Sequence, residues 1–423
     1  MLLIHEIKTG KLSDILNKIS LILLVAVVVT LPFQVKLNSI CIILFSVSIL
    51  INLGIKGVFQ RLSFLNYLFI SFFALHCIGM IYTSNLKAGG FELEKKLALI
   101  IFPLFLGVFQ INKEQFSKVL LGFVISCFIG ITYLFLVAFT KYLIFDHSAY
   151  FFIGRFTGPL NGIHRVYLAM YFVFSISCCI YFIKDRIFPQ IANLWFFLAI
   201  FCFSVGVFLV SARMSLFVYL ILMIRYLYSF LYVRKNYVLG IIVIIVMVAS
   251  FSFIVNNTRM LGKITEVFRD LDKGNSKRNT SSANLRVIKW KSAVRLYFDN
   301  LLIGVGTGDA SDELVSLYAK ENFFWGLKHR YNAHNEFLEI AVTLGTLGLI
   351  LWLAILLIPL WLSLKYNQYL YIEFIFIFAS CSFTESMLNA QKGVIFYALF
   401  NTLFFVQITK VIKAHKQQAI KKA

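Results

Sequence analysis

Acidic residues are scarce in this chain, and so are the residue patterns that hold metals or disulfides. Its 423 residues include 40 Lys and Arg but only 19 Asp and Glu. The metal motifs HExxH and CxxC do not occur, and all seven cysteines fall inside apolar stretches. These absences indicate neither a zinc site nor a disulfide framework. We therefore expect no metal and no cofactor.

Charged residues make up only 14% of the chain, whereas hydrophobic residues make up 60%. A soluble core of this size cannot bury so much apolar surface, so the composition predicts an all-α protein that crosses the membrane many times. About twelve apolar stretches approach the ~20-residue length that spans a bilayer. They cover residues 15–33, 38–55, 63–82, 93–110, 117–140, 166–183, 191–210, 214–232, 237–256, 337–362, 367–384 and 393–410.

The net charge of +21 follows the predicted topology. With the N-terminus inside, the cytoplasmic ends of the spans carry about twice as many Lys and Arg as the short outside connections, as the positive-inside rule requires. Both termini are then cytoplasmic, and the charge indicates no nucleic-acid partner. The chain divides into residues 1–256 with nine spans, an outside loop at 257–336, and residues 337–423 with three spans and a basic tail.

The outside loop has its own helical pattern. Residues 264–271 predict a short amphipathic helix, a polar loop follows, and residues 285–298 predict a second helix lying against the membrane surface. Gly304-Val305-Gly306-Thr307-Gly308 then interrupts the pattern. This run lacks the Lys-Ser/Thr of a phosphate-binding loop, so we expect a tight turn that lets the backbone approach a neighbouring segment.

His334 and Asn335 stand where the polar loop meets the next apolar span, and Gly345 and Gly348 follow them. On a helix, His334 and both glycines would share one face, so the pattern predicts a titratable ring at the water boundary above a groove of small residues. A neighbouring helix or a lipid chain can lie in such a groove. The alternative is a His-Asn pair that caps a closely packed helix.

Three arginines are predicted to face the same outer side as His334: Arg165, Arg213 and Arg286. A guanidinium group stays charged and binds phosphate through two parallel hydrogen bonds. Each arginine can instead reach the phosphates of membrane lipids, and for Arg165 we favour that interpretation. Glu336 and Glu339 occupy the first turns after His334, where they can orient its ring or an acceptor, or simply favour the N-terminus of a helix.

These motifs together resemble the O-antigen ligase family, which shares a superfamily with O-antigen polymerases and bacterial O-oligosaccharyltransferases. The family pattern is His, then Asn, Ser or Gln, nine residues, Gly, two residues, and Gly, Thr or Tyr; His334, Asn335, Gly345 and Gly348 match it. The stretch from Arg286 and Trp290 to Gly304-Val305-Gly306 is similar to a second family motif, and Arg213 occupies the place of another family arginine. The chain departs from the family in lacking a proline before Gly304 and in the flanks of Arg213.

The resemblance implies a metal-independent, inverting glycosyltransferase of the GT-C type in the bacterial inner membrane. Its donor would be a glycan on undecaprenyl pyrophosphate, and its acceptor a sugar hydroxyl of the lipid A–core, at the periplasmic face. In this interpretation His334 takes the proton of the acceptor, and Arg213 and Arg286 bind the pyrophosphate. His334 can equally position the acceptor or hydrogen-bond the phosphate.

Three other functions compete with ligation. A polymerase or a protein O-oligosaccharyltransferase would use the same donor with a different acceptor, and the long loop before His334 favours the ligase. A polysaccharide or lipid transporter would use the arginines as an anionic path. Transporters often contain repeats or paired, proline-broken helices. Only five prolines occur, and those near the spans form no symmetric pair, which disfavours a transporter.

Overall fold

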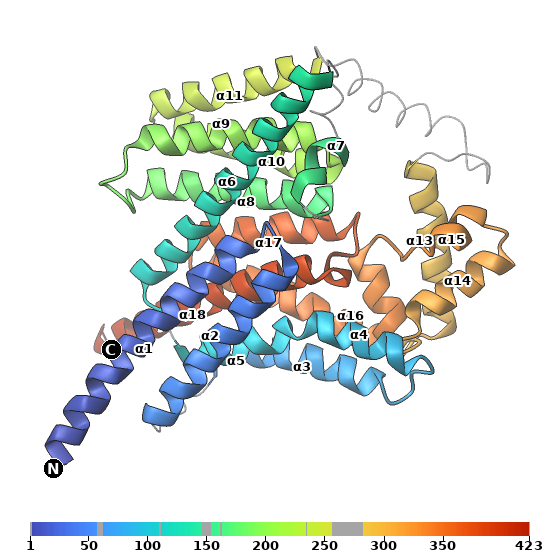
Figure 1. The fold of residues 1–423 in the computed structure, drawn as a ribbon, viewed down its shortest axis with the longest axis horizontal. Helices are drawn as coiled ribbons and strands as arrows, with labels where there is room; N and C mark the ends of the chain where they lie inside the picture. Colours follow the sequence, from blue (N-terminus) through green and yellow to red (C-terminus); the bar gives the residue numbers. More distant parts are fainter. Residues whose placement is uncertain are drawn as a thin grey trace.

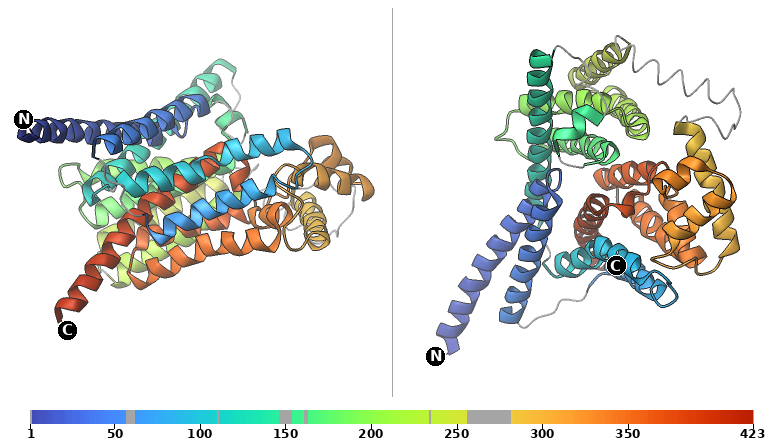
Figure 2. Two further views of the ribbon diagram at one scale, coloured as in Figure 1. Left: turned by 90° about the horizontal axis from the view of Figure 1, so that it is seen from below. Right: turned by 45° about the vertical axis from the view of Figure 1, so that its right-hand side comes forward.

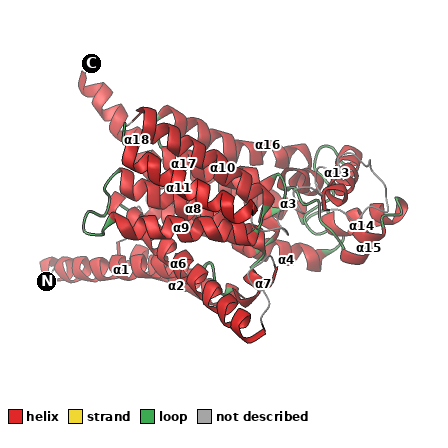
Figure 3. Ribbon diagram, turned by 90° about the horizontal axis from the view of Figure 1, so that it is seen from above, coloured by secondary structure: helices red, strands yellow, loops and turns green. Residues whose placement is uncertain are grey.

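The computed structural model describes residues 2–56, 62–109, 111–145, 154–160, 163–233, 235–255 and 282–422. In these ranges all regular structure is helical and no strand occurs (Figure 3). The predicted short helix at 264–271 lies outside the described residues. The sequence-based expectation of an all-helical membrane protein is therefore confirmed for the described part of the chain.

Eight described helices are long and apolar enough to cross a membrane. They are α1 (Leu2–Thr30), α2 (Val35–Lys56), α6 (Lys113–Phe145), α8 (Arg165–Lys184), α9 (Asn193–Val210), α10 (Arg213–Tyr228, extended by the π-helical turn η3, Ser229–Val233), α16 (Glu336–Lys365) and α18 (Gln391–Lys422). Four further apolar helices fall short of this criterion: α3 (Phe64–Gly79), α5 (Ala98–Phe109), α11 (Tyr237–Val255) and α17 (Tyr369–Ser382). Each of the twelve expected spans thus overlaps an apolar helix, and the number of crossings beyond eight stays a prediction.

One expected span, 93–110, is not a single helix. The chain forms α4 (Leu86–Lys96) and then, after a break at Leu97, the apolar α5. The break is slight, because Leu97 keeps a right-handed helical conformation and its amide donates to the carbonyl of Glu94 at 3.3 Å. The charged end of α4 is held by ion pairs from Lys95 and Lys96 to Glu92.

The spans form a bundle with α8 near its centre, where 94% of the spanning window of α8 is buried. Aromatic rings fill the space around α8: Phe174 contacts Phe374 of α17 and Phe396 and Phe400 of α18. Both chain termini lie at one end of the bundle (Figure 2). At the opposite end, α13 (Ser282–Asp299), α14 (Ala310–Lys320) and α15 (Phe324–His329) form a separate small layer (Figure 1).

This layer has its own apolar core, which it shares with the start of α16. Ala293 and Leu296 of α13 and Leu314 and Tyr318 of α14 are buried together with Val342 of α16. The helix predicted for residues 285–298 therefore exists as α13, and it packs against protein on at least one face. The remaining short elements are α7 (Gly154–Thr157) and the 3₁₀ turns η2 (Gly158–Leu160) and η4 (Met387–Asn389).

The expected continuous helical face from His334 to Gly348 is wrong at two points. His334 precedes the helix, which begins at Glu336, and its backbone has a φ of 47°. Gly345 interrupts the helix with a φ of 63° and a ψ of −158°. A Cβ at Gly345 would lie 2.4 Å from the carbonyl carbon of Leu302, so backbone of the preceding loop occupies the space where a groove was expected.

The kink at Gly345 is where the glycine-rich segment docks. The amides of Val305 and Gly306 donate to the carbonyls of Val342 and Thr343 at 2.9 and 3.0 Å, and the amide of Thr346 donates to the carbonyl of Leu301 at 2.8 Å. These bonds replace the helical ones that the kink breaks, so the buried backbone groups stay paired. The interpretation of the glycine run as a close backbone approach is confirmed, and this contact fixes α13 relative to α16.

Candidate active site

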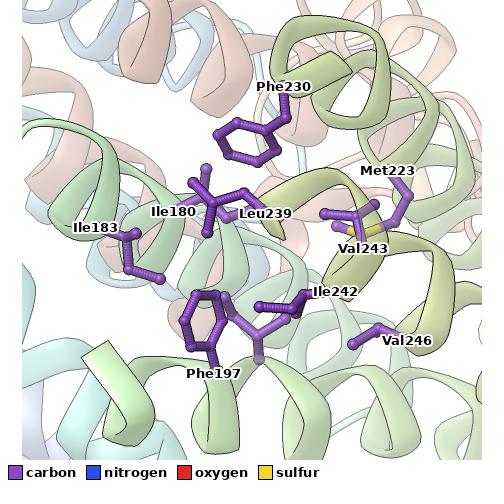
Figure 4. Close-up of a pocket in the computed structure, with 10 residues that line it drawn as sticks. Ile180, Ile183, Phe197, Met223, Phe230, Leu239, Ile242, Val243 and Val246 are labelled. Atoms are coloured by element: carbon purple, nitrogen blue, oxygen red, sulfur yellow. The ribbon is translucent and has the colours of Figure 1, made fainter. Parts of the chain in front are cut away.

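An apolar cavity between α8, α9, α10 and α11 has no groups for chemistry. Its walls are carbon and thioether side chains, among them Ile180, Phe197, Met223, Phe230 and Val243 (Figure 4). The titratable side chains gather elsewhere, where the α13–α15 layer meets the starts of α8, α10 and α16. That junction is the candidate active site.

His334 lies in the linker between α15 and α16. Its amide donates to Oδ1 of Asn332 at 3.1 Å, which supports the left-handed backbone conformation. Asn335 is the N-cap of α16, since its Oδ1 accepts from the amides of Phe337 and Leu338 at 2.9 and 3.2 Å. The capping alternative is therefore right for Asn335, and the cap holds the neighbouring His334 ring outside the helix.

Glu385 is the direct partner of His334. One of its carboxylate oxygens, Oε1, lies 3.0 Å from His334 Nδ1, and the His334 side chain is 25% exposed. Burial acts to raise the pKa of Glu385, but the hydrogen bond and charge of His334, with the nearby His164 and Arg286, outweigh it and lower that pKa. Glu385 is thus ionised at neutral pH and holds Nδ1 of His334, while no hydrogen bond to Nε2 is found among the described residues.

Glu336 and Glu339 position the segment that carries Glu385, and among the described residues neither forms a hydrogen bond or ion pair with the His334 ring. Glu336 Oε2 accepts from the amide of Leu388 at 2.7 Å. The two oxygens of Glu339 accept from the amide of Ala333 and from the side chain of Asn389, both at 2.9 Å. The start of α16 therefore ties the linker before His334 to the turn after Glu385. Glu336 and Glu339 can therefore orient the His334 ring only indirectly, through the linker and the turn that they hold.

The three predicted arginines come together at this junction. Arg213 is exposed at the first turn of α10, and Arg165 is half-buried at the first turn of α8. Burial lowers the pKa of Arg286 on α13, Glu385 opposes this, and the fields of Arg213 and Arg165 lower it further. Arg165 and Arg286 are more than a hundred residues apart in the sequence, and the charges of Arg165 and Arg213 both act on Arg286, so the three arginines lie near one another. Arg165 lies near Arg286, and its favoured role as a lipid-phosphate contact stays a prediction.

Lys289 and His164 are parts of the site that the sequence reasoning missed. The Lys289 ammonium lies 4.5 Å from the centre of the Tyr331 ring, and the residue is only 5% exposed. Burial and the charge of Arg286 lower the pKa of Lys289 to about 7. His164 caps the start of α8, and burial, opposed by Glu385, lowers its pKa.

Signals for some of these residues exist in the sequence. Lys289 follows Arg286 by one helical turn, so both share a face of α13. Glu385 follows the apolar stretch 367–384 directly, at the predicted outer boundary. Nothing in the sequence pairs Glu385 with His334, because 51 positions and two helices separate them.

Tyr331 links Lys289 to His334. Its ring stacks on His329 at 5.3 Å and meets the His334 ring edge-on at 5.8 Å. The ladder continues from His329 to Trp325, whose rings are parallel within 2°. These aromatic contacts help to fix the linker that carries His334.

The fold and the site together define a multi-pass, helical membrane protein with a cationic site and a His–Glu pair at one end of its bundle. A comparison with known families makes the class more specific. The model of the O-antigen ligase family matches residues 198–353, a segment that contains Arg213, Arg286, His334, Gly345 and Gly348.

The resemblance to the O-antigen ligase family is thereby confirmed over this segment, and the family indicates glycan transfer of the ligase or polymerase kind. Arg165 and Glu385 lie outside the matched residues. No curated protein matches the chain.

Proposed function

We propose that this protein is an O-antigen ligase that transfers a glycan from undecaprenyl pyrophosphate to a sugar hydroxyl of the lipid A–core. The observation that carries the proposal is the His334–Glu385 pair beside three arginines, in a chain with the O-antigen ligase segment. This arrangement supplies a group that takes a proton and a set of cations that receive a leaving phosphate.

His334 takes the proton of the acceptor hydroxyl. Its Nδ1 is held by the ionised Glu385, so Nε2 is the nitrogen that faces the acceptor and removes the proton as attack proceeds. The carboxylate then stabilises the imidazolium that forms, as an orienting acid does in hydrolase triads.

The arginines act on the leaving group. As the acceptor oxygen bonds to the anomeric carbon, the bond from that carbon to the phosphate oxygen breaks and charge builds on the pyrophosphate. Arg213 and Arg286, with Arg165 nearby, neutralise this charge. Protonated Lys289 adds a further positive charge. Direct attack inverts the anomeric centre, and undecaprenyl pyrophosphate leaves with its full diphosphate.

The topology that we propose puts this site at the periplasmic face of the inner membrane, with both termini in the cytoplasm. It is supported by the positions of the termini at one end of the bundle and of the α13–α15 layer at the other (Figure 2). Residues 257–336 would form the periplasmic loop between spans at 1–256 and 337–423, in a glycosyltransferase of the GT-C type.

Reconstitution distinguishes the possible acceptors. Purified protein in nanodiscs would be given a polyprenyl-pyrophosphate glycan and lipid A–core, with and without a metal chelator. We expect glycan on the core and undiminished transfer in chelator. A longer glycan that stays on the polyprenol would identify a polymerase instead, and loss of transfer in chelator would contradict the metal-independent account.

A further inference from the structure

A second polar cleft lies at the end of the bundle near the chain termini, far from His334. It opens between the start of α3, the end of α5 and the C-terminal part of α18, and it has a volume of about 270 Å³. Its lining comprises Leu62, Ser63, Asn66, Gly107, Val406, Thr409, Lys410 and Lys413. The lining includes two lysines and two hydroxyl groups and no carboxylate.

The wall of this cleft is built from fixed polar groups. Asn66 is 1% exposed, and its side-chain amide donates to the carbonyl of Pro103 inside α5 at 2.5 Å. The Ser63 hydroxyl donates to Asn66 Oδ1 at 2.7 Å. Gly107 lets the Asn66 side chain approach α5 closely, because a Cβ there would lie 2.2 Å from Asn66 Nδ2. The cleft is thus part of the packing between α3 and α5.

The charge of the cleft comes from α18. Lys410 donates to the carbonyl of Ile111 at 2.7 Å, which fixes its ammonium group near the cleft, and Lys413 follows one helical turn later. Lys413 is exposed, and no ion pair of Lys413 occurs among the described residues. Two ammonium groups on one helical face repel each other, and an anion bound between them removes that repulsion.

We propose that this cleft binds the phosphate of an anionic phospholipid, with Lys410 and Lys413 on the phosphate and Thr409 as a neutral donor. The cleft lies where membrane-spanning helices end, which is the depth of lipid headgroups, and basic pockets between helices at this depth bind anionic lipids. Leu62 and Val406 add apolar lining beside the polar groups, which suits the glycerol and upper chains of a lipid better than free phosphate.

A lipid bound in this cleft would stabilise the packing of α3 and α18, which both extend toward the active site. α3 runs from the cleft to Gly79, beside which the Thr307 hydroxyl donates to the carbonyl of His76 at 2.7 Å. α18 runs from the cleft back to the turn η4, which is tied to Glu336. The proposed lipid therefore stabilises the frame of the bundle, independently of the reaction at the other end.

The test compares two charge-matched double variants of the full chain. K410Q/K413Q removes the lysines of the cleft, and K118Q/K416Q removes two other exposed lysines, Lys118 with its ion pair to Glu114 and Lys416 on α18. Each protein is purified in detergent and titrated with phosphatidylglycerol or phosphatidylcholine, and bound lipid is counted by native mass spectrometry. We expect wild type and the control to prefer phosphatidylglycerol, and K410Q/K413Q to bind it about tenfold more weakly.

Two further measurements separate lipid binding from misfolding and from binding of free phosphate. The single variant K413E changes only an exposed residue and should also lose the preference, which separates binding from misfolding. Inorganic phosphate that competes for the cleft at the same concentration as the lipid would assign a free-phosphate site and overturn the lipid proposal. Equal losses in both double variants, or no preference for phosphatidylglycerol in wild type, would overturn it as well.

Discussion

Glu373 lies near the start of α17, and Glu385 lies just after its end. Both carboxylates are buried, and each pairs with a basic side chain. Glu373 pairs with Arg225 and accepts a hydrogen bond from Tyr226 at 2.5 Å, and the Tyr226 oxygen is also hydrogen-bonded to the Ser177 hydroxyl at 2.9 Å. Glu385 forms an ion pair with His334, and His164 and Arg286 lie close enough for their charges to act on it.

The two carboxylates differ in the kind of basic side chain that each one pairs with, and this difference suggests different roles. The partner of Glu373 is an arginine, whose guanidinium carries only donor groups, so the pair joins two helices. The partner of Glu385 is a histidine, whose imidazole can accept a proton on one nitrogen while a carboxylate holds the other. One pair holds α10 to α17, and the other can move a proton.

The largest expected difference comes from removing each basic partner. We expect His334→Ala to reduce glycan transfer by about 10²–10⁴-fold, the range of a lost general base, while the protein stays folded because His334 lies in a linker. Arg225→Ala should instead lower the melting temperature and the yield, since it leaves Glu373 buried without its charge partner. Transfer by equal amounts of purified protein measures the first effect. Near-normal transfer by His334→Ala would exclude the proposed base.

The next test changes the two carboxylates to amides of the same shape. Glu385→Gln should lower turnover about 10- to 100-fold, the usual effect of losing a residue that orients a reacting group. Glu373→Gln should leave turnover nearly unchanged and lower the melting temperature. Matched losses of turnover in both variants would show that the two pairs do not differ in role.

The Glu385 pair should also respond to acid in a defined direction. Because the pKa of Glu385 is lowered in the folded protein, its ionised form adds stability that is present above the unfolded pKa, about 4.3, and is lost as pH falls through the folded value. The difference in stability between wild type and Glu385→Gln should therefore shrink in acid. Thermal unfolding followed from neutral pH downward measures it.

At the site that contains His334, Lys289 should add a smaller, pH-dependent effect on binding of the donor. Its pKa of about 7 means that it loses its charge as pH rises through that value, so binding of the pyrophosphate donor should weaken by up to about tenfold between pH 6 and 8. Lys289→Arg, which stays charged, should remove this dependence, and Lys289→Met should bind weakly throughout. An unchanged pH profile in Lys289→Arg would exclude Lys289 as a phosphate contact.

The contribution of Lys289 to protein stability should change with pH in the opposite direction to its contribution to donor binding. Its folded pKa lies below the unfolded value of about 10.4, so the folded state disfavours the charged form. Stability therefore rises with pH between about 7 and 10. Lys289→Met should lack that rise, which thermal unfolding at several pH values would detect.

The smallest expected effect concerns the frame that holds the reactive pair. Gly345→Ala should destabilise the protein by about 1–3 kcal/mol, because the residue has a positive φ and its Cβ would meet the Leu302 backbone. Gly90→Ala is the matched control, since nothing lies within 4 Å of its Cβ position in α4. Thermal unfolding of both variants tests the docking contact, and equal melting temperatures would argue against it.

Much of the fold and part of the site could be predicted from the sequence. The apolar stretches, the helix α13, the cap at Asn335 and the close backbone approach at Gly304–Gly306 follow from local residue preferences. The family resemblance predicted His334, Arg213 and Arg286 as site residues, and their roles stay predictions. The kink at Gly345 was missed, because periodicity assumes that a helix continues, and only the docked loop makes an interruption favourable.

The sequence alone determined that this chain is a helical membrane protein, since hydropathy and the positions of lysine and arginine act on each segment separately. The tertiary structure alone decided which charges meet. Glu385, Lys289 and Arg165 reach the His334 site from three different helices or turns, and the energy of that cluster depends on distance and burial. Distances and burial between residues far apart in the sequence arise only when the chain folds, so local sequence patterns do not give them.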